Sequence, residues 1–149
     1  MKMVPTLVLS VPYSAKQTNQ EASRNLETVR WAQRNLAQIG FNSVAPVLDS
    51  IHFQITDDTN TVLPTDEWSE WCHEAIKQQI LYGMTHGTLI FFPNVERCTY
   101  SLAEIKAAEL AAERHSKWVL YLDYEDGMLV LPDNLMDLHA KFMEQQEHC

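Results

Sequence analysis

Apolar residues recur every three to four positions in four segments of the chain, a spacing that predicts amphipathic helices. The first segment begins near Asn19 and carries Leu26, Val29 and Leu36 on one side. Gly40 follows it, where a left-handed residue would end the helix. Thr65 has the residue type of an N-cap for the second helix, and Gly83 is placed to end it. The four predicted helices span 19–39, 65–83, 101–115 and 132 to about 143.

Short runs rich in β-branched and aromatic residues lie between these helices and predict strands. They cover residues 4–11, 42–47, 88–92, 118–122 and, as a further edge strand, 128–131. Strands that alternate with helices favour an α/β fold with a mainly parallel sheet. Residues 48–64 show no regular pattern, and a loop of that length is often a binding loop.

Composition narrows the classes of function. A chain of 149 residues with ordinary apolar content predicts one domain, residues 1–149, that buries a substantial core. The net charge of −9 argues against a protein that binds duplex nucleic acid, since such a protein needs a basic face. No run approaches 18 consecutive apolar residues, so we expect no membrane partner. The N-terminal apolar run is broken by prolines, and we interpret it as a strand rather than a signal peptide.

Neither the cysteines nor the known cofactor-binding motifs indicate a metal site or a cofactor. Cys72, Cys98 and Cys149 are odd in number and widely spaced, which predicts free thiols in a reducing cytoplasm. Neither Cys72 with His73 nor the C-terminal Glu147-His148-Cys149 has the paired spacing of a zinc site, so we expect no metal. The chain also lacks both glycine-rich phosphate-binding fingerprints, and we expect no dinucleotide cofactor.

Glu104 is the strongest candidate for chemistry. It follows the apolar run 88–92 and a polar loop, and it falls in the first turn of the helix predicted from Ser101. In open α/β sheets ligands bind beyond the carboxyl ends of the strands. A carboxylate near helix amides is favoured in its ionised form and can act as nucleophile or base. The spacing Ser101-x-x-Glu104 also fits a capping box, a purely structural alternative.

Three patches of sequence resemble the nucleoside 2-deoxyribosyltransferase-like superfamily, including its small phage-associated members. The first is Ser10-Val-Pro-Tyr-Ser14 after the first strand, and the second is the segment from Ala45 to His52 after the second strand. The third is Glu104-Ile-Lys-Ala-Ala108, similar to the family's E-I-x-x-A. Their order and spacing extend the resemblance from about residue 4 to residue 123.

The resemblance implies a flavodoxin-like, mainly parallel sheet of four to five strands flanked by helices. It implies that Glu104 attacks the anomeric carbon of a 2-deoxyribosyl nucleoside or nucleotide, so that the base leaves and the deoxyribosyl group is transferred to another base or to water. Relatives commonly form homo-oligomers of two or more subunits that complete each other's sites, so the same is expected here. The residues expected to bind substrate are Tyr13, Ser14, Cys98, Tyr100, Ser101, Asp49 and His52.

Two alternatives stay open. Tyr100 stands where relatives carry glycine, and no acid stands near Gln79, where relatives carry an aspartate that handles the departing base. These departures favour a non-catalytic module that binds or sequesters a nucleotide on the same fold. A plain interaction protein is a further alternative, in which Trp31, Trp68 or the C-terminal helix forms an oligomer interface. Arg24 and Arg30 on the first helix have the chemistry to bind a phosphate, although solvated arginines are the commoner case.

Overall fold

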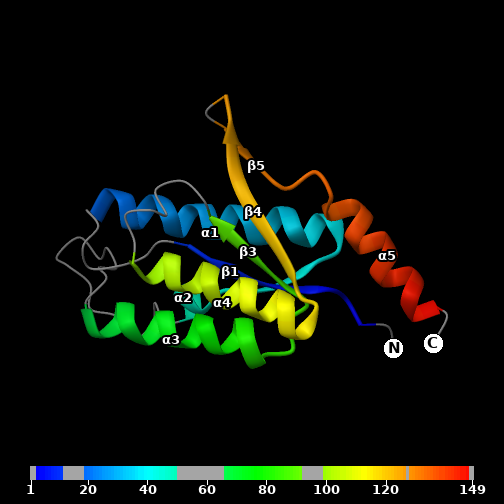
Figure 1. Ribbon diagram of the computed structural model, residues 1–149. Coiled ribbons are helices and arrows are strands. Elements are labelled where there is room, and N and C mark those ends of the chain that lie inside the picture. The colour runs from blue at the N-terminus through cyan, green and yellow to red at the C-terminus, as the bar shows by residue number, and fades with distance from the viewer. Residues whose placement is uncertain (1–2, 12–18, 50–65, 92–98, 127, 148–149) are drawn as a thin grey trace.

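The computed structural model describes residues 3–11, 19–49, 66–91, 99–126 and 128–147. Within these ranges the chain forms five strands and five helices (Figure 1). In chain order they are β1 (Thr6–Ser10), α1 (Asn19–Ile39), β2 (Asn42–Val44), α2 (Pro46–Asp49), α3 (Asp66–Tyr82), β3 (Gly87–Phe91), α4 (Thr99–His115), β4 (Trp118–Glu125), β5 (Met128–Val130) and α5 (Leu135–Glu147).

The five described strands form one sheet in the order β2-β1-β3-β4-β5. The first four are parallel, and β5 runs antiparallel to β4. The predicted α/β class with a mainly parallel sheet flanked by helices is therefore confirmed, with one antiparallel strand at its edge. Because consecutive residues of a strand point to opposite faces, Leu7 and Leu9 face one side of β1 while Val8 and Ser10 face the other.

Helices cover both faces of the sheet. α1 lies on one face, and α3 and α4 pack side by side on the other (Figure 1). A right-handed crossover produces this division, because the chain moves one way from β1 to β2 and the opposite way from β2 through β3 to β4. The largest fully buried side chains, each less than 2% exposed, include Leu7, Leu36, Ile76, Ile80 and Ile90, and they form the core between these layers.

The segment after β1 and α1 differs from the prediction. The strand expected over 42–47 ends at Val44, and Pro46 begins the short helix α2. Proline suits the first turn of a helix because the backbone N–H that it lacks has no partner there. Gly40 behaves as predicted: its φ is 115°, and the amide of Phe41 donates to the carbonyl of Leu36 at 2.9 Å.

β4 is longer than predicted and extends past β3. Its pairing with β3 ends at Leu122, and only Asp123, Tyr124 and Glu125 pair with β5. Asp126, with φ of 52°, has the backbone conformation that a two-residue hairpin turn requires. The β4–β5 hairpin therefore projects beyond the parallel sheet and crosses over α1 (Figure 1).

α5 returns to the amino-terminal ends of the strands, away from the carboxyl ends. The Gln146 side-chain amide donates to the carbonyl of Met3 at 2.8 Å and accepts from the Met3 amide at 2.7 Å. The ring of Phe142 meets His86 edge-on, with ring centres 4.5 Å apart. These contacts connect α5 to the start of the chain, and they leave the opposite end of the sheet for a site.

Candidate functional site

The strand order changes direction between β1 and β3, the two central strands. β1 ends at Ser10 and β3 ends at Phe91, and Ser10 pairs with Ile90 across the two strands. In open α/β sheets this switch point, at the carboxyl ends of the strands, is the usual place for a ligand. α4 follows β3, so the topology brings the beginning of α4 close to the end of β1.

Glu104 on α4 lies at this switch point and joins three elements. The hydroxyl of Ser10 donates to Glu104 Oε1 at 2.7 Å. His73 Nδ1, from α3, lies 3.1 Å from the other carboxylate oxygen, Oε2. All three side chains are buried, and only 2% of Glu104 is exposed. Serine, glutamate and histidine thus form a connected and buried polar cluster.

Ser10 and His73, the hydrogen-bond partners of Glu104, were not predicted as site residues, although the sequence indicates both as buried polar positions. Ser10 is the polar residue that ends the apolar run Leu7-Val8-Leu9. His73 falls three residues before Ile76, on the buried side of α3. Buried polar side chains are usually hydrogen-bonded, so each of these two positions implied a partner in the core. Which partner it was depends on how α3 and α4 pack, and one sequence does not reveal that.

The environment of Glu104 acts on its charge in two opposite directions. Burial disfavours the carboxylate and raises the pKa of Glu104 above its ordinary value, and this is the largest effect. The hydrogen bonds from His73 and Ser10, together with the nearby charges of His73 and Lys77, lower that pKa and offset part of the increase. Strongly perturbed carboxyl groups of this kind are concentrated at functional sites.

The geometry differs from that of a serine hydrolase. In such a triad the histidine stands between the serine and the acid, and it takes the proton of the serine. Here the carboxylate stands in the middle, and Ser10 donates to Glu104 rather than to His73. Ser10 is therefore placed to hold the carboxylate, and Glu104 is the group with the central position for chemistry.

Removing the Ser10 hydroxyl tests this electrostatic account. In the Ser10→Ala variant the ionised form of Glu104 loses a hydrogen-bond donor, so we expect its pKa to rise further. Selective ¹³C labelling of glutamate carboxyl groups and NMR titration measure this pKa directly. The matched control is Ser43→Ala on β2, which should leave it unchanged. A Glu104 pKa that is equal in wild type and Ser10→Ala would contradict the role assigned to the hydroxyl.

The other residues predicted to bind substrate are only partly within the described ranges. Tyr13, Ser14, His52 and Cys98 lie outside them. The remaining three, Tyr100, Ser101 and Asp49, are described in backbone only. Tyr100 and Ser101 belong to the first turn of α4, and Asp49 is the last residue of α2.

The capping-box role that the spacing Ser101-x-x-Glu104 allows for Glu104 does not agree with the structure. α4 begins at Thr99, two residues before the expected cap at Ser101. Both oxygens of Glu104 bond to side chains of other elements, Ser10 of β1 and His73 of α3. In a capping box the glutamate instead reaches back to the first amide of its own helix.

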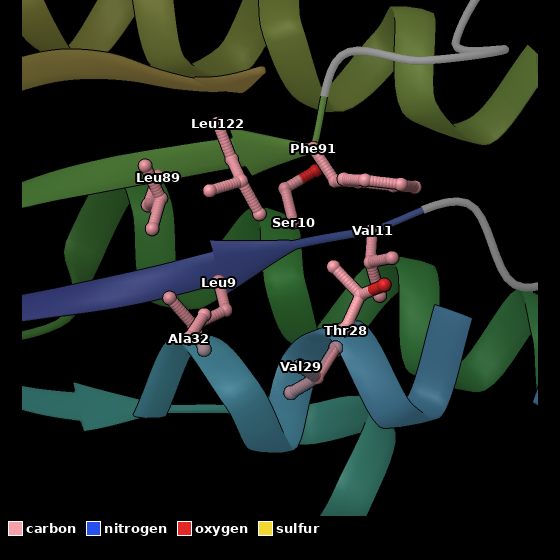
Figure 2. Close-up of a pocket in the computed structure, with 9 residues that line it drawn as sticks. All are labelled: Leu9, Ser10, Val11, Thr28, Val29, Ala32, Leu89, Phe91 and Leu122. Carbon is pink, nitrogen blue, oxygen red and sulfur yellow. The ribbon is translucent and has the colours of Figure 1, made fainter. Parts of the chain in front are cut away.

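A small cavity on the other face of the sheet is not a nucleoside site. Figure 2 shows it between α1 and the carboxyl ends of the central strands, and its lining includes Leu9, Val11, Phe91, Thr28 and Val29. Its volume is about 10 Å³, close to the smallest space that holds one water molecule. Ligand pockets are usually at least about 300 Å³. The Ser10 hydroxyl points away from α1 in Figure 2, toward the side of Glu104.

Within the described ranges no three side chains of His, Cys, Asp or Glu gather closely enough to hold a metal ion. No helix in the described part of the chain combines the length and the apolar character that a bilayer-spanning helix requires.

Comparison of the chain with models of protein families, with curated proteins and with solved structures finds no match. The resemblance to deoxyribosyltransferases therefore stays a prediction that is based on the residues quoted for it. We therefore base the argument for a function on the geometry of the cluster around Glu104.

Proposed function

We propose that the protein cleaves the N-glycosidic bond of a small 2-deoxyribosyl nucleoside or nucleotide, with Glu104 as the nucleophile. The observation that carries this proposal is the position of Glu104. It is a buried carboxylate at the switch point of the sheet, held by Ser10 and His73. The resemblance around Ser10, His52 and Glu104 supplies the substrate class, and a flavodoxin-like fold is part of the same proposal.

The chemistry of the bond explains why a carboxylate suits the task. As the base departs, positive charge develops at the anomeric carbon of the sugar, and a carboxylate close to it captures that carbon covalently. Water or a second base then releases the sugar. Each oxygen of Glu104 makes one contact and has a second lone pair that is available for attack. Ser10 and His73 keep the carboxylate oriented.

A second function is favoured by one specific observation. Glu104 is only 2% exposed and both its oxygens are bonded, as in a structural buried group. This arrangement supports a module that binds or sequesters a nucleotide without cleaving it, in agreement with the departures at Tyr100 and Gln79. In both functions we expect a small-molecule partner, a homo-oligomer and a cytoplasmic location, all of which stay predictions.

One assay separates the two functions. The purified protein is incubated with 2′-deoxynucleosides and with their 5′-monophosphates, and free base is measured by chromatography. We expect base release from a subset of these compounds. The thermal unfolding midpoint is measured with the same compounds, since a ligand that binds the native state raises it. Stabilisation without release would support the binding module, and neither effect with any compound would contradict both functions.

A further inference from the structure

Aromatic rings attach α5 to the amino-terminal ends of the strands. The helix lies at one end of the molecule, beside the start of the chain (Figure 1). Phe142 of α5 stands nearly perpendicular to His86, with ring centres 4.5 Å apart, and to Trp118, with ring centres 6.2 Å apart. One turn earlier, His139 packs against Phe41 with ring centres 5.6 Å apart. His86 is thus the titratable ring that α5 contacts most directly on the sheet.

His86 keeps its position through a hydrogen bond that requires an unprotonated ring nitrogen. The backbone amide of Thr6, the first residue of β1, donates to His86 Nδ1 at 3.0 Å. The backbone amide of His86 donates in turn to the carbonyl of Thr6 at 2.7 Å. A ring nitrogen that accepts a hydrogen bond carries no proton, so His86 is neutral here, with its proton on Nε2. A proton on Nδ1 would set two N–H groups against each other and break this contact with β1.

The surroundings of His86 oppose a second proton on its ring. Burial is the larger of two effects that lower the pKa of His86 below its ordinary value of 6.5, and the charge of Lys117 lowers that pKa further. The Lys117 ammonium is fixed nearby, because it donates to the carbonyls of Ile80 at 3.0 Å and of Gly83 at 2.9 Å.

The elements around His86 supply no compensating carboxylate contact. β1 and β3 carry no charged side chain. Among the described residues, no carboxylate forms an ion pair with His86. The titratable groups with described side chains on α5 are His139, which packs on Phe41, and the exposed Asp137, Lys141 and Glu144.

We propose that His86 is a pH-dependent switch for α5: protonation of its ring breaks the hydrogen bond from Thr6 and releases α5 from the sheet. The released helix uncovers the rings of Phe41 and Trp118, so that an apolar surface hidden at neutral pH is exposed in acid. The sign follows from linkage, since α5 contributes through Phe142 to the burial that lowers the pKa of His86. This contribution to attachment is complete above pH 6.5 and is lost as pH falls through the lowered pKa.

Hydrogen–deuterium exchange of the full-length protein, measured by mass spectrometry, tests the release of α5. The rates are corrected for the intrinsic effect of pH on exchange. Between about pH 7.5 and about pH 5 we expect the open fraction of α5 to rise about tenfold, the change that one pKa unit of linkage implies. Segments of α1 and α4 should keep their protection, which distinguishes release of one helix from unfolding of the whole protein.

His86→Asn is the decisive variant. The side-chain oxygen of asparagine accepts the Thr6 amide as Nδ1 does, but asparagine does not titrate. The open fraction of α5 should therefore change less than about twofold over the same pH range. His115→Asn replaces an exposed histidine at the end of α4. It is the matched control and should release α5 like the wild type.

Ring ¹⁵N chemical shifts of the wild type test the same switch without a variant. At neutral pH they should show the proton of His86 on Nε2, and titration of this ring should coincide with the loss of protection in α5. Equal pH dependence in wild type and His86→Asn would overturn the inference. So would a proton on Nδ1 at neutral pH, stronger protection of α5 in acid, or loss of protection in α4 at the same pH as in α5. None of these results depends on Glu104 or on base release.

Discussion

Glu104→Gln is expected to reduce base release by at least about 1,000-fold, because the variant lacks the nucleophile that forms the covalent intermediate. Glutamine is the informative replacement. Its amide has nearly the shape of the carboxyl group, accepts a hydrogen bond from Ser10 and donates one to the neutral ring of His73. Glu104→Ala removes the same nucleophile but leaves a cavity and two buried polar groups without partners. Loss of activity in that variant has a second explanation, poor folding.

The same substitution is expected to change how stability depends on pH. Burial raises the pKa of Glu104 in the native state above its ordinary value of 4.5. Between these two pKa values the native state binds more protons than the unfolded state, so the wild type loses stability as pH rises through that window. Glu104→Gln does not titrate there. The two proteins should have similar stability below pH 4.5, and the variant should be the more stable one at neutral pH.

Urea unfolding at a series of pH values measures this difference, and the chromatographic assay measures base release from the same samples. Glu109→Gln, on the exposed face of α4, is the matched control and should change neither property. Full activity in Glu104→Gln would refute the assignment of the nucleophile. Lower activity with unchanged pH dependence of stability would instead show that Glu104 is not a buried titrating group.

Most of the fold was predictable because the pattern of apolar residues is local information. The strand at 88–92, the helix from Asn19 and the end of that helix at Gly40 follow from spacing and from the conformational freedom of glycine. α2 was missed because Val47 and Leu48 continue an apolar run, and a run that short fits either a strand or a buried helix. The length of β4 was missed because residues 123–125 are polar or aromatic and are paired only through β5.

The position of Glu104 at the carboxyl ends of the strands was predictable, and its hydrogen-bond partners were not. Glu104 follows a buried strand, and that position alone indicates the ligand-binding end of the sheet. The link from Glu104 to Ser10 spans 94 residues and the link to His73 spans 31. Such contacts depend on the strand order and on how α3 packs against α4. The electrostatics of Glu104 are a tertiary property, because desolvation of its carboxylate arises only when both helices cover the sheet.

Gly40→Ala is expected to cost about 2–4 kcal/mol of stability, the sum of an unfavourable backbone conformation and a steric conflict. The φ of 115° at Gly40 is one that residues with a side chain rarely adopt. A Cβ atom there would also collide with the ring of His139 on α5, a ring that packs against Phe41 with centres 5.6 Å apart. The variant therefore has to strain the end of α1 and displace the ring of His139 at the same time.

A double-mutant cycle separates these two costs. His139→Ala removes the ring and leaves the backbone of Gly40 unchanged, so Gly40→Ala should cost about 1–2 kcal/mol less in that background. Urea unfolding of wild type, both single variants and the double variant supplies the four free energies. The remaining cost then measures the backbone conformation alone. An equal cost of Gly40→Ala in both backgrounds would mean that His139 does not press against Gly40. In that case the ring of His139 moves aside for the new methyl group, and the cost of Gly40→Ala arises from the backbone conformation alone.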